Sequence, residues 1–250
     1  HKSSRGLGDV YKRQDTASKE IMQIYNSDNF ETSDKADGSP LTLADKASNQ
    51  IITEGLKKIT PDIAVISEET FEDTILKALP NLYWLVDPLD GTREFINKND
   101  EFTVNIALIE DRKPVFGIVA APVFEKCWHG SIFDNYHSDK SIPDVLRIVM
   151  SKSHKSDNDK SFLNYLNEKG VNYKIIEKGS SLKLCAIADN EADIYPRFGP
   201  TSEWDIAAAH SVLSAYGGCV LKVDDFSDLS YAKKESILNP CLLYTSPSPR

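Results

Sequence analysis

The spacing of apolar positions predicts two helices in the first 60 residues. Apolar side chains between Ala17 and Tyr25 recur at helical intervals, so a helix is expected there. Leu41–Asp45 opens a second helix, in which Thr42 and Asp45 have the spacing of a capping box, with Asp where Glu is usual. The polar segment Lys35–Pro40 between the two helices predicts an exposed loop.

Alternation of apolar and polar residues predicts strands in the rest of the first half. A short strand at 64–67 ends at Glu68 and Glu69. Residues 102–109 alternate, with Phe102, Val104, Ile106 and Leu108 on one face and Thr103, Asn105 and Ala107 on the other. Residues 115–121 continue the pattern, and the intervening 111–114 indicates a hairpin. The first half is therefore predicted to be helices that cover an antiparallel sheet.

The second half alternates between predicted strands and predicted helices. The segment 128–143 is polar and irregular, and we place the boundary between the halves there. Beyond it we expect strands at 146–150, 171–176 and 192–195, and helices at 159–168, 181–189 and 202–216. This order predicts an α/β arrangement. We therefore divide the chain into an N-terminal α+β half, 15–140, and a C-terminal α/β half, 141–240.

The two ends differ from the rest of the chain in their pattern. Residues 1–14 have no clean periodicity, and residues 241–250 end in a Ser/Pro-rich run. We interpret both segments as non-native tails and leave them out of the fold prediction.

Composition narrows the class of protein. The chain has 250 residues, of which 40% are hydrophobic and 27% charged, as is typical of globular proteins. The formal charge of −9 argues against a nucleic-acid-binding surface, which needs a basic face. The four cysteines are widely spaced and indicate reduced thiols in a cytoplasmic protein. No run of residues is long and apolar enough for a membrane span, and no signal peptide is visible.

The most informative segment is Asp-Pro-Leu-Asp-Gly-Thr, which follows a short apolar run. Pro88 fixes φ and Gly91 allows a sharp bend, so Asp87, Asp90 and Thr92 are expected on one tight turn. Mg²⁺ prefers several oxygen ligands of this kind. An ordinary exit from a strand into a turn remains the alternative, because the same residues favour turns.

Other carboxylates are harder to assign from spacing alone. Glu68 follows a predicted strand, whereas Asp205 lies in the first turn of a predicted helix. A carboxylate there stabilises the helix dipole, and Glu203 fulfils that role equally well, so spacing leaves Asp205 undecided. For Asp45 spacing favours a helix-capping role.

These motifs together resemble a known enzyme family. Glu-Glu, then Asp-Pro-Leu-Asp-Gly-Thr, then Trp-Asp-x-Ala-Ala resembles the signature of the lithium-sensitive, magnesium-dependent phosphomonoesterases of the inositol monophosphatase superfamily. The resemblance runs from about Ala17 to Pro240. Further segments resemble the branch of 3'(2'),5'-bisphosphate nucleotidases of CysQ type: 37–42, 92–95, 101–109, 179–183 and 195–201. The segment 128–143 departs from the family because it lacks the usual glycine-rich hairpin.

The resemblance implies a layered α-β-α-β-α sugar-phosphatase fold and a magnesium centre. Glu68, Asp87 and the main-chain carbonyl of Leu89 would hold one Mg²⁺. Asp87, Asp90 and Asp205 would hold a second, and a third, weaker ion is often found near Glu68. Paired metals of this kind act on the attacking and leaving oxygens of a displacement.

The resemblance also implies catalytic roles. Thr92 and Glu68 would position and deprotonate the attacking water, whose pKa the cation lowers. Asp45 would accept a hydrogen bond from the Thr92 hydroxyl, a role compatible with capping. Glu69 would support the site electrostatically.

Substrate-binding residues are carried over in the same way. The resemblance implies that the amides of Gly91 and Thr92 receive the phosphate, and that the following residues also contact substrate: His154, Ser180, Lys183, Arg197 and Asp205. Without it, Lys183, Arg197 and His154 would be interpreted as surface residues. Trp84 and Trp204 flank metal ligands, but we expect them to be packing residues.

The function implied is Mg²⁺-dependent removal of the 3'-phosphate from adenosine 3',5'-bisphosphate, which gives AMP and phosphate and clears a by-product of sulfate assimilation. Hydrolysis of inositol 1-phosphate or fructose 1,6-bisphosphate is the alternative within the superfamily. A non-catalytic nucleotide-binding module is the alternative of another class, and it predicts loss of at least one metal carboxylate. The expected partner is a small nucleotide bisphosphate substrate. We expect no nucleic-acid partner and no membrane span, and we expect the chain to be a monomer or homodimer.

Overall fold

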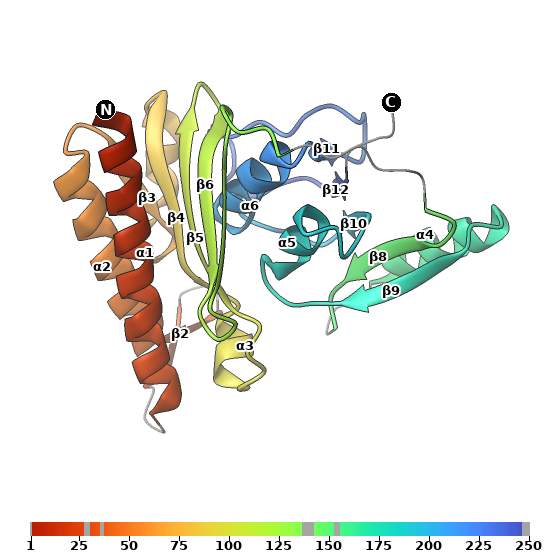
Figure 1. The fold of residues 1–250 in the computed structure, drawn as a ribbon, viewed down its shortest axis with the longest axis horizontal. Coiled ribbons are helices and arrows are strands. Elements are labelled where there is room, and N and C mark those ends of the chain that lie inside the picture. Colours follow the sequence, from red (N-terminus) through yellow and green to blue (C-terminus); the bar gives the residue numbers. More distant parts are fainter. Residues whose placement is uncertain (1, 28–30, 36–37, 137–142, 153–155, 247–250) are drawn as a thin grey trace.

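The protein is built from alternating layers of helices and sheets (Figure 1). This computed structural model describes residues 2–27, 31–35, 38–136, 143–152 and 156–246. Helices α1 (Lys2–Asn26) and α2 (Leu43–Ile59) form one outer layer. They cover a first sheet, behind which α5 (Leu182–Ala188) and α6 (Glu203–Ala215) separate it from a second sheet. Helix α4 (Asp157–Glu168) packs on the second sheet, so the predicted α-β-α-β-α fold is confirmed.

The first sheet has the strand order β3-β4-β5-β6-β7. Its strands are β3 (Ala64–Ser67), β4 (Leu82–Asp90), β5 (Thr103–Glu110), β6 (Lys113–Ala121) and β7 (Lys126–Ser131). All neighbours are antiparallel except β3 and β4, which are parallel. The alternation predicted for β5 is confirmed, because Val104 and Ile106 pack in the core beneath α1 and α2 whereas Ala107 joins the core on the opposite face.

Strand β7 lies in the segment that we predicted to be irregular. Lys126–Ser131 pairs with β6 along its whole length, so the prediction for 128–131 is wrong. The strand forms an edge of the sheet, where half of its side chains can stay polar, and this explains the weak hydrophobic pattern. The predicted boundary at 140/141 lies outside the described residues.

Helix α6 approaches the first sheet closely because glycines face it. A Cβ atom on Gly117 of β6 would overlap the main-chain carbonyl of Ala208, and one on Gly130 of β7 would lie 2.7 Å from the carbonyl oxygen of Ser211. The backbone of α6 therefore lies directly on the sheet, and this contact fixes the position of Asp205 near the helix start.

The second sheet has the strand order β11-β12-β10-β8-β9. Its strands are β8 (Leu146–Met150), β9 (Tyr173–Glu177), β10 (Ile194–Arg197), β11 (Cys219–Lys222) and β12 (Leu242–Thr245). Strand β8 is parallel to β9 and β10, as expected for an α/β half, and β12 runs antiparallel to both of its neighbours.

Both end segments that we left out of the fold prediction contribute to the fold. Helix α1 begins at Lys2, and Val10 and Gln14 are buried. Strand β12 lies between β10 and β11, with Leu242 and Tyr244 fully buried. Two alternating apolar residues are too short a pattern to reveal a strand next to a Ser/Pro-rich run. Leaving these segments out of the fold was therefore wrong.

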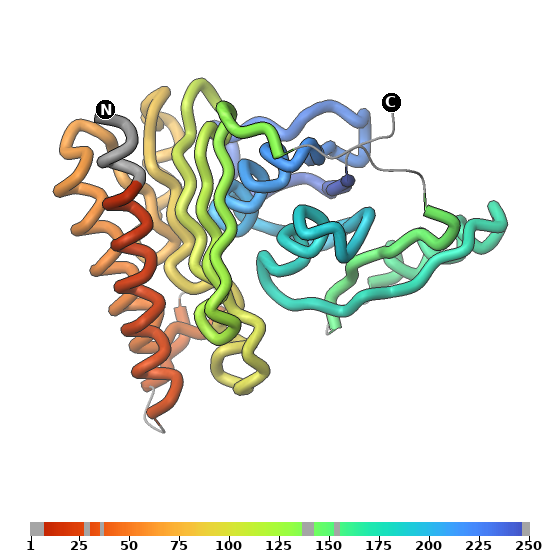
Figure 2. Tube along the Cα trace, in the orientation of Figure 1, coloured from red at the N-terminus to blue at the C-terminus, as the bar shows by residue number. Residues whose placement is uncertain are grey.

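The remaining elements are short. They are β1 (Thr32–Asp34), β2 (Pro40–Thr42), α3 (Thr92–Ile96) and two 3₁₀ helices, Glu68–Thr70 and Asp73–Ala78. Strands β1 and β2 flank the predicted loop, whose residues 36–37 are not described. The chain trace shows the early residues in the layers on one side and the later residues in the layers on the other (Figure 2). Within the described ranges, no helix combines the length and apolar character that crossing a bilayer requires.

Candidate active site

Strand β4 carries Asp87 and Asp90 through an irregularity in its pairing with β5. Asp87 lies opposite Asn105, but Asp90 lies opposite Thr103, so β4 has one more residue than its partner between these points. Side chains alternate along a regular strand, and the inserted residue brings two positions three apart to the same face. The sequence predicts one tight turn that carries Asp87, Asp90 and Thr92, with a sharp bend at Gly91. The structure shows a bulged strand that continues to Asp90, and the sharp bend follows at Gly91, whose φ is 92°.

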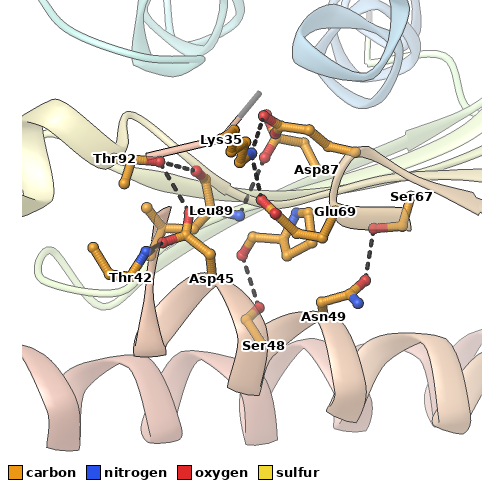
Figure 3. Close-up of polar contacts among 12 residues, drawn as sticks. Lys35, Thr42, Asp45, Ser48, Asn49, Ser67, Glu69, Asp87, Leu89 and Thr92 are labelled. Carbon is orange, nitrogen blue, oxygen red and sulfur yellow. Dashed lines mark hydrogen bonds and ion pairs between the residues drawn. The ribbon is translucent and has the colours of Figure 1, made fainter. Parts of the chain in front are cut away.

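The bulge is held from below by helix α2. The Ser48 hydroxyl donates to the carbonyl oxygen of Pro88 at 2.7 Å (Figure 3). The main-chain N–H of Leu89 donates to Asp87 Oδ1 at 3.1 Å. Both carboxylates therefore project from a fixed backbone.

Glu68 and Glu69 begin the 3₁₀ helix that follows β3, and a lysine lies between their carboxylates. Lys35 Nζ lies 2.7 Å from Glu68 Oε1 and 2.7 Å from Glu69 Oε1 (Figure 3). Burial, opposed by hydrogen bonding and the charge of Lys35, raises the pKa of Glu69 to about 7. Lys35 is not among the predicted site residues because it lies in the segment predicted to be an exposed loop. The signal that could have indicated it is the need of two adjacent, partly buried carboxylates for a counter-charge.

Asp205 joins these carboxylates from the other half of the chain. It occupies the third position of α6, where its Oδ2 accepts a hydrogen bond from the Ser202 N–H at 2.7 Å as part of a capping box. Burial and the negative charge of Asp90 raise the pKa of Asp205 to about 8, and Glu68 adds to this effect. Asp205 therefore caps α6 and also lies close to the other carboxylates.

Asp87 lies at the centre of the cluster. Its side chain is 1% exposed, and burial together with the charges of Glu68, Asp90 and Asp205 raises its pKa well above the ordinary range. Four carboxylates from three distant segments therefore form one electrostatic unit, hereafter the acidic cluster.

The donor set of the acidic cluster fits a hard divalent cation. Carboxylates and a main-chain carbonyl are the oxygen ligands that Mg²⁺ prefers, and mutual repulsion among buried carboxylates favours a bound cation. Among the described residues, no three Asp, Glu, His or Cys side chains already enclose a common metal position. Their oxygens are engaged by protein donors instead, with Lys35 on Glu68 and the Ser202 N–H on Asp205. The fit therefore rests on the ligand chemistry and on the concentration of negative charge.

Thr92 and Asp45 form a polar pair beside the acidic cluster. Thr92 Oγ1 donates to Asp45 Oδ1 at 2.9 Å and lies 3.4 Å from the carbonyl oxygen of Leu89. Asp45 Oδ2 accepts the N–H and the hydroxyl of Thr42, at 2.7 and 2.6 Å. Both contacts expected of Asp45, the cap of α2 and the bond from Thr92, are confirmed.

A cavity of about 160 Å³ opens next to the acidic cluster. Its lining includes Asp90, Glu94, Ser180, Lys183, Arg197 and Asp205. It therefore brings three of the predicted substrate-binding side chains, Ser180, Lys183 and Arg197, close to the predicted metal ligands Asp90 and Asp205.

The two basic residues of this cavity are poorly solvated. Burial lowers the pKa of Lys183 to about 8, although Asp90, Glu94 and Glu101 oppose the shift and Arg197 adds to it. Arg197 donates from Nη2 to the carbonyl oxygen of Pro200 at 3.0 Å, while its buried Nε has no partner among the described residues. An anionic group bound in the cavity would lie close to both positively charged side chains.

Three hydroxyl groups whose contact with Asp90 was not predicted surround its carboxylate. Ser180 donates to Asp90 Oδ2 at 2.7 Å, and the Ser181 and Thr103 hydroxyls lie 3.0 and 3.4 Å from the same oxygen. The signal available was the Gly-Ser-Ser-Leu-Lys segment, in which we assigned the first serine to substrate alone.

Three remaining predictions concern residues around the site. Trp84 donates to Thr60 and is buried, and Trp204 packs on Phe71 with ring centroids 5.0 Å apart, so both are packing residues as expected. His154 lies outside the described residues.

Comparison with known proteins identifies the family. The inositol monophosphatase family model matches residues 9–243. The chain is 42% identical to 3'(2'),5'-bisphosphate nucleotidase CysQ of Salmonella typhimurium over 231 residues, covering 88% of this chain and 91% of that protein. It is 40% identical, with the same coverage, to the CysQ nucleotidase of Escherichia coli K12.

Solved structures agree with the sequence comparison. The crystal structure of CysQ from Bacteroides thetaiotaomicron has a TM-score of 0.84 and 32% identity, covering 98% of both chains. A Thermotoga maritima IMPase, at 19% identity and a TM-score of 0.76, shares the fold over 96% of this chain and 91% of its own. The Asp-Pro-Leu-Asp-Gly-Thr motif on a bulged strand, the layered fold and these matches lead to one assignment: the chain belongs to the inositol monophosphatase family.

Proposed function

We infer that this protein is a Mg²⁺-dependent phosphomonoesterase that removes the 3'-phosphate of adenosine 3',5'-bisphosphate and releases AMP and phosphate. The observation that carries this inference is the acidic cluster with a cavity beside it that contains Lys183 and Arg197. The first feature suits a cation that binds the phosphate to be cleaved, and the second suits another phosphate of the same molecule.

The residues that would hold Mg²⁺ are those of the acidic cluster. We assign one ion to Glu68, Asp87 and the carbonyl of Leu89, and a second to Asp87, Asp90 and Asp205. A third, weaker ion would lie beside Glu68. When bound, Mg²⁺ supplies charge stabilisation to phosphoryl oxygens and makes water more acidic.

Thr92, Asp45 and Glu68 would prepare the attacking water. Because the Thr92 proton is directed to Asp45 Oδ1, the Thr92 oxygen has lone pairs with which to accept a hydrogen bond from water. This orients the water, and the Glu68 carboxylate would receive its proton. Asp45 keeps the Thr92 hydroxyl in one orientation because its other oxygen is held by Thr42.

Binding of the two phosphates would be divided between two parts of the site. The main-chain amides of Gly91 and Thr92, at the bend after β4, would receive the phosphate to be cleaved. Arg197 and Lys183 would bind the 5'-phosphate, the first through its forked guanidinium and the second as a point charge. Ser180 and His154 would contact the nucleotide, the latter near the base.

The alternatives differ in the substrates that they predict. Inositol 1-phosphate has no second phosphate, so a phosphatase for it would not need a lysine and an arginine in a cavity beside the acidic cluster. Fructose 1,6-bisphosphate does carry a second phosphate, and the substrate comparison below distinguishes it from the nucleotide. A non-catalytic nucleotide-binding module would not need the acidic cluster. The relatives above 40% identity are named as bisphosphate nucleotidases, which supports our choice of substrate.

The test is phosphate release from adenosine 3',5'-bisphosphate, inositol 1-phosphate and fructose 1,6-bisphosphate, with Mg²⁺, with chelator, and with added Li⁺. We expect preferential, Mg²⁺-dependent turnover of the nucleotide. Preference for either sugar substrate would overturn the substrate assignment, and nucleotide binding without turnover would support the binding module. In the cell, such an activity would clear a by-product of sulfate assimilation.

A further inference from the structure

Three hydroxyl groups converge on one oxygen of Asp90. Two of them belong to serines, of which Ser181 is the more buried. Ser180, Ser181 and Thr103 approach Asp90 Oδ2 at 2.7, 3.0 and 3.4 Å. We propose that Ser181, oriented by Asn105 and assisted by Thr103, is a positioning residue that sets the Asp90 carboxylate for cation binding. The proposal rests on the metal-dependent function inferred above and assigns residues that do not themselves touch the substrate.

The local structure around Ser181 is unusual for a helix start. Ser181 is the N-cap residue of α5, yet its side chain makes no capping hydrogen bond. A serine at this position usually accepts a hydrogen bond from its own helix. Here the hydroxyl points away from α5 and toward the acidic cluster, at 1% residue exposure.

The direction of the Ser181 proton follows from the hydrogen bonds around it. Asn105 Nδ2 donates to Ser181 Oγ at 2.9 Å, and the amide nitrogen has no lone pair to accept in return. The single hydroxyl proton must therefore go to one of the acceptors on the other side. These are Asp90 Oδ2 at 3.0 Å and the main-chain carbonyl of Asp205 at 2.9 Å.

This arrangement links two predicted metal ligands from different halves of the chain. Asp90 is on β4, Asp205 is on α6, and the Ser181 hydroxyl lies within hydrogen-bond distance of both residues. Thr103 contributes a bond of 2.6 Å to the Ser180 hydroxyl, which keeps that group on Asp90. The hydroxyls converge on Oδ2, so Oδ1 of Asp90 is the oxygen left for a cation. Hydrogen bonds to ligating carboxylates fix their orientation and tune their affinity.

The test compares single hydroxyl deletions in the full chain. Ser181→Ala and Thr103→Val each remove one hydroxyl with little change in shape. Ser211→Ala is the matched control, because Ser211 is 2% exposed and its hydroxyl donates to the Gly130 carbonyl at 2.9 Å, away from the acidic cluster. Mn²⁺ affinity is measured by calorimetry without substrate, and kcat, KM and thermal unfolding are measured alongside.

We expect Ser181→Ala to weaken Mn²⁺ binding by about 10-fold or more, as is typical when a group that supports a metal ligand is lost. Thr103→Val should weaken it less, because its contact with Asp90 is longer. Ser211→Ala should lower the unfolding temperature without changing Mn²⁺ affinity. If Ser181→Ala does not fold, Ser181→Cys keeps a weaker donor and should give an intermediate affinity.

The outcomes separate this inference from the proposed function. Wild-type protein that binds no Mn²⁺ would refute the metal-dependent function itself. Wild-type binding that Ser181→Ala leaves unchanged would overturn the positioning role alone. A loss of affinity in Ser211→Ala equal to that in Ser181→Ala would assign the effect to general loosening, and would also overturn it.

Discussion

Thr92 Oγ1 donates to Oδ1 of Asp45 across 2.9 Å, while Oδ2 of the same carboxylate is held by Thr42. Asp45 thus caps helix α2 through Oδ2 and holds Thr92, the first residue of α3, through Oδ1. The Thr92 hydroxyl, which we infer to be catalytic, is therefore held by a residue in the first turn of α2. The stability of this helix terminus and the activity of the site are coupled for that reason.

Replacement of Thr92 by Val tests the role of its hydroxyl. The side-chain shape is kept, but the group that would orient water is lost, so we expect kcat to fall about 100-fold with little change in KM. Thr92→Ser, which keeps the hydroxyl, should retain most of the activity. Steady-state phosphate release measures both constants. An unchanged kcat in the Val variant would remove Thr92 from the mechanism.

Asp90→Asn tests the acidic cluster. The substitution preserves volume but replaces a charged ligand oxygen, so turnover should fall by more than about 100-fold while the circular dichroism spectrum stays unchanged. Asp157→Asn is the control, since its carboxylate is exposed on α4 and its partner among the described residues is Lys160. Activity retained in the Asp90 variant would refute the two-cation scheme.

Lys183 should give substrate binding a dependence on alkaline pH. Burial lowers the pKa of Lys183 to about 8, so the side chain is charged below pH 8 and becomes neutral above it. The substrate phosphates are already fully ionised above about pH 7. We therefore expect kcat/KM for adenosine 3',5'-bisphosphate to fall between pH 7.5 and 9.5, values chosen to bracket this pKa.

Two controls identify the group responsible for that pH dependence. Lys183→Arg keeps its charge over the whole range and should remove the alkaline fall. Adenosine 3'-monophosphate has no 5'-phosphate, so its kcat/KM in the wild-type protein should fall little over the same pH range. An equal fall for both substrates would assign the effect to another group.

Gly117→Ala should disturb both stability and the site. The added methyl group would overlap the Ala208 carbonyl, so α6 must move away from the sheet, at a cost of about 3 kcal/mol in the free energy of unfolding. Because Asp205 lies at the start of α6, kcat should fall as well. Gly8→Ala in α1 meets no atom within 4 Å and should be neutral or stabilising by about 0.5–1 kcal/mol. Urea denaturation of both variants measures the difference.

The parts of the fold that follow local patterns could be predicted from the sequence. The alternation in 102–109 predicts β5 with its two faces, and the helix predicted at 202–216 matches α6, Glu203–Ala215. Strand β12 was missed because it has few residues, and β7 because an exposed edge needs little hydrophobic alternation.

The site shows the same division between local and distant information. Asp87 and Asp90 stand out in a short motif, but the bulge that aligns them depends on pairing with β5. Lys35, Asn105 and Ser181 contribute through partners between 33 and 91 positions away in the chain. No periodicity indicates such contacts, so only the folded arrangement reveals them.

The place of β12 in the second sheet has a consequence for how the protein is made. This strand comes after β11 in sequence, yet it fills the gap between β10 and β11 and bonds to both. During translation the N-terminal layers can assemble while the ribosome is still adding residues, because domains tend to fold as units from the N-terminus. The second sheet has to wait until residues 242–245 leave the exit tunnel. Until then the facing edges of β10 and β11 stay open, and this is the interval in which a nascent chain would most need a chaperone.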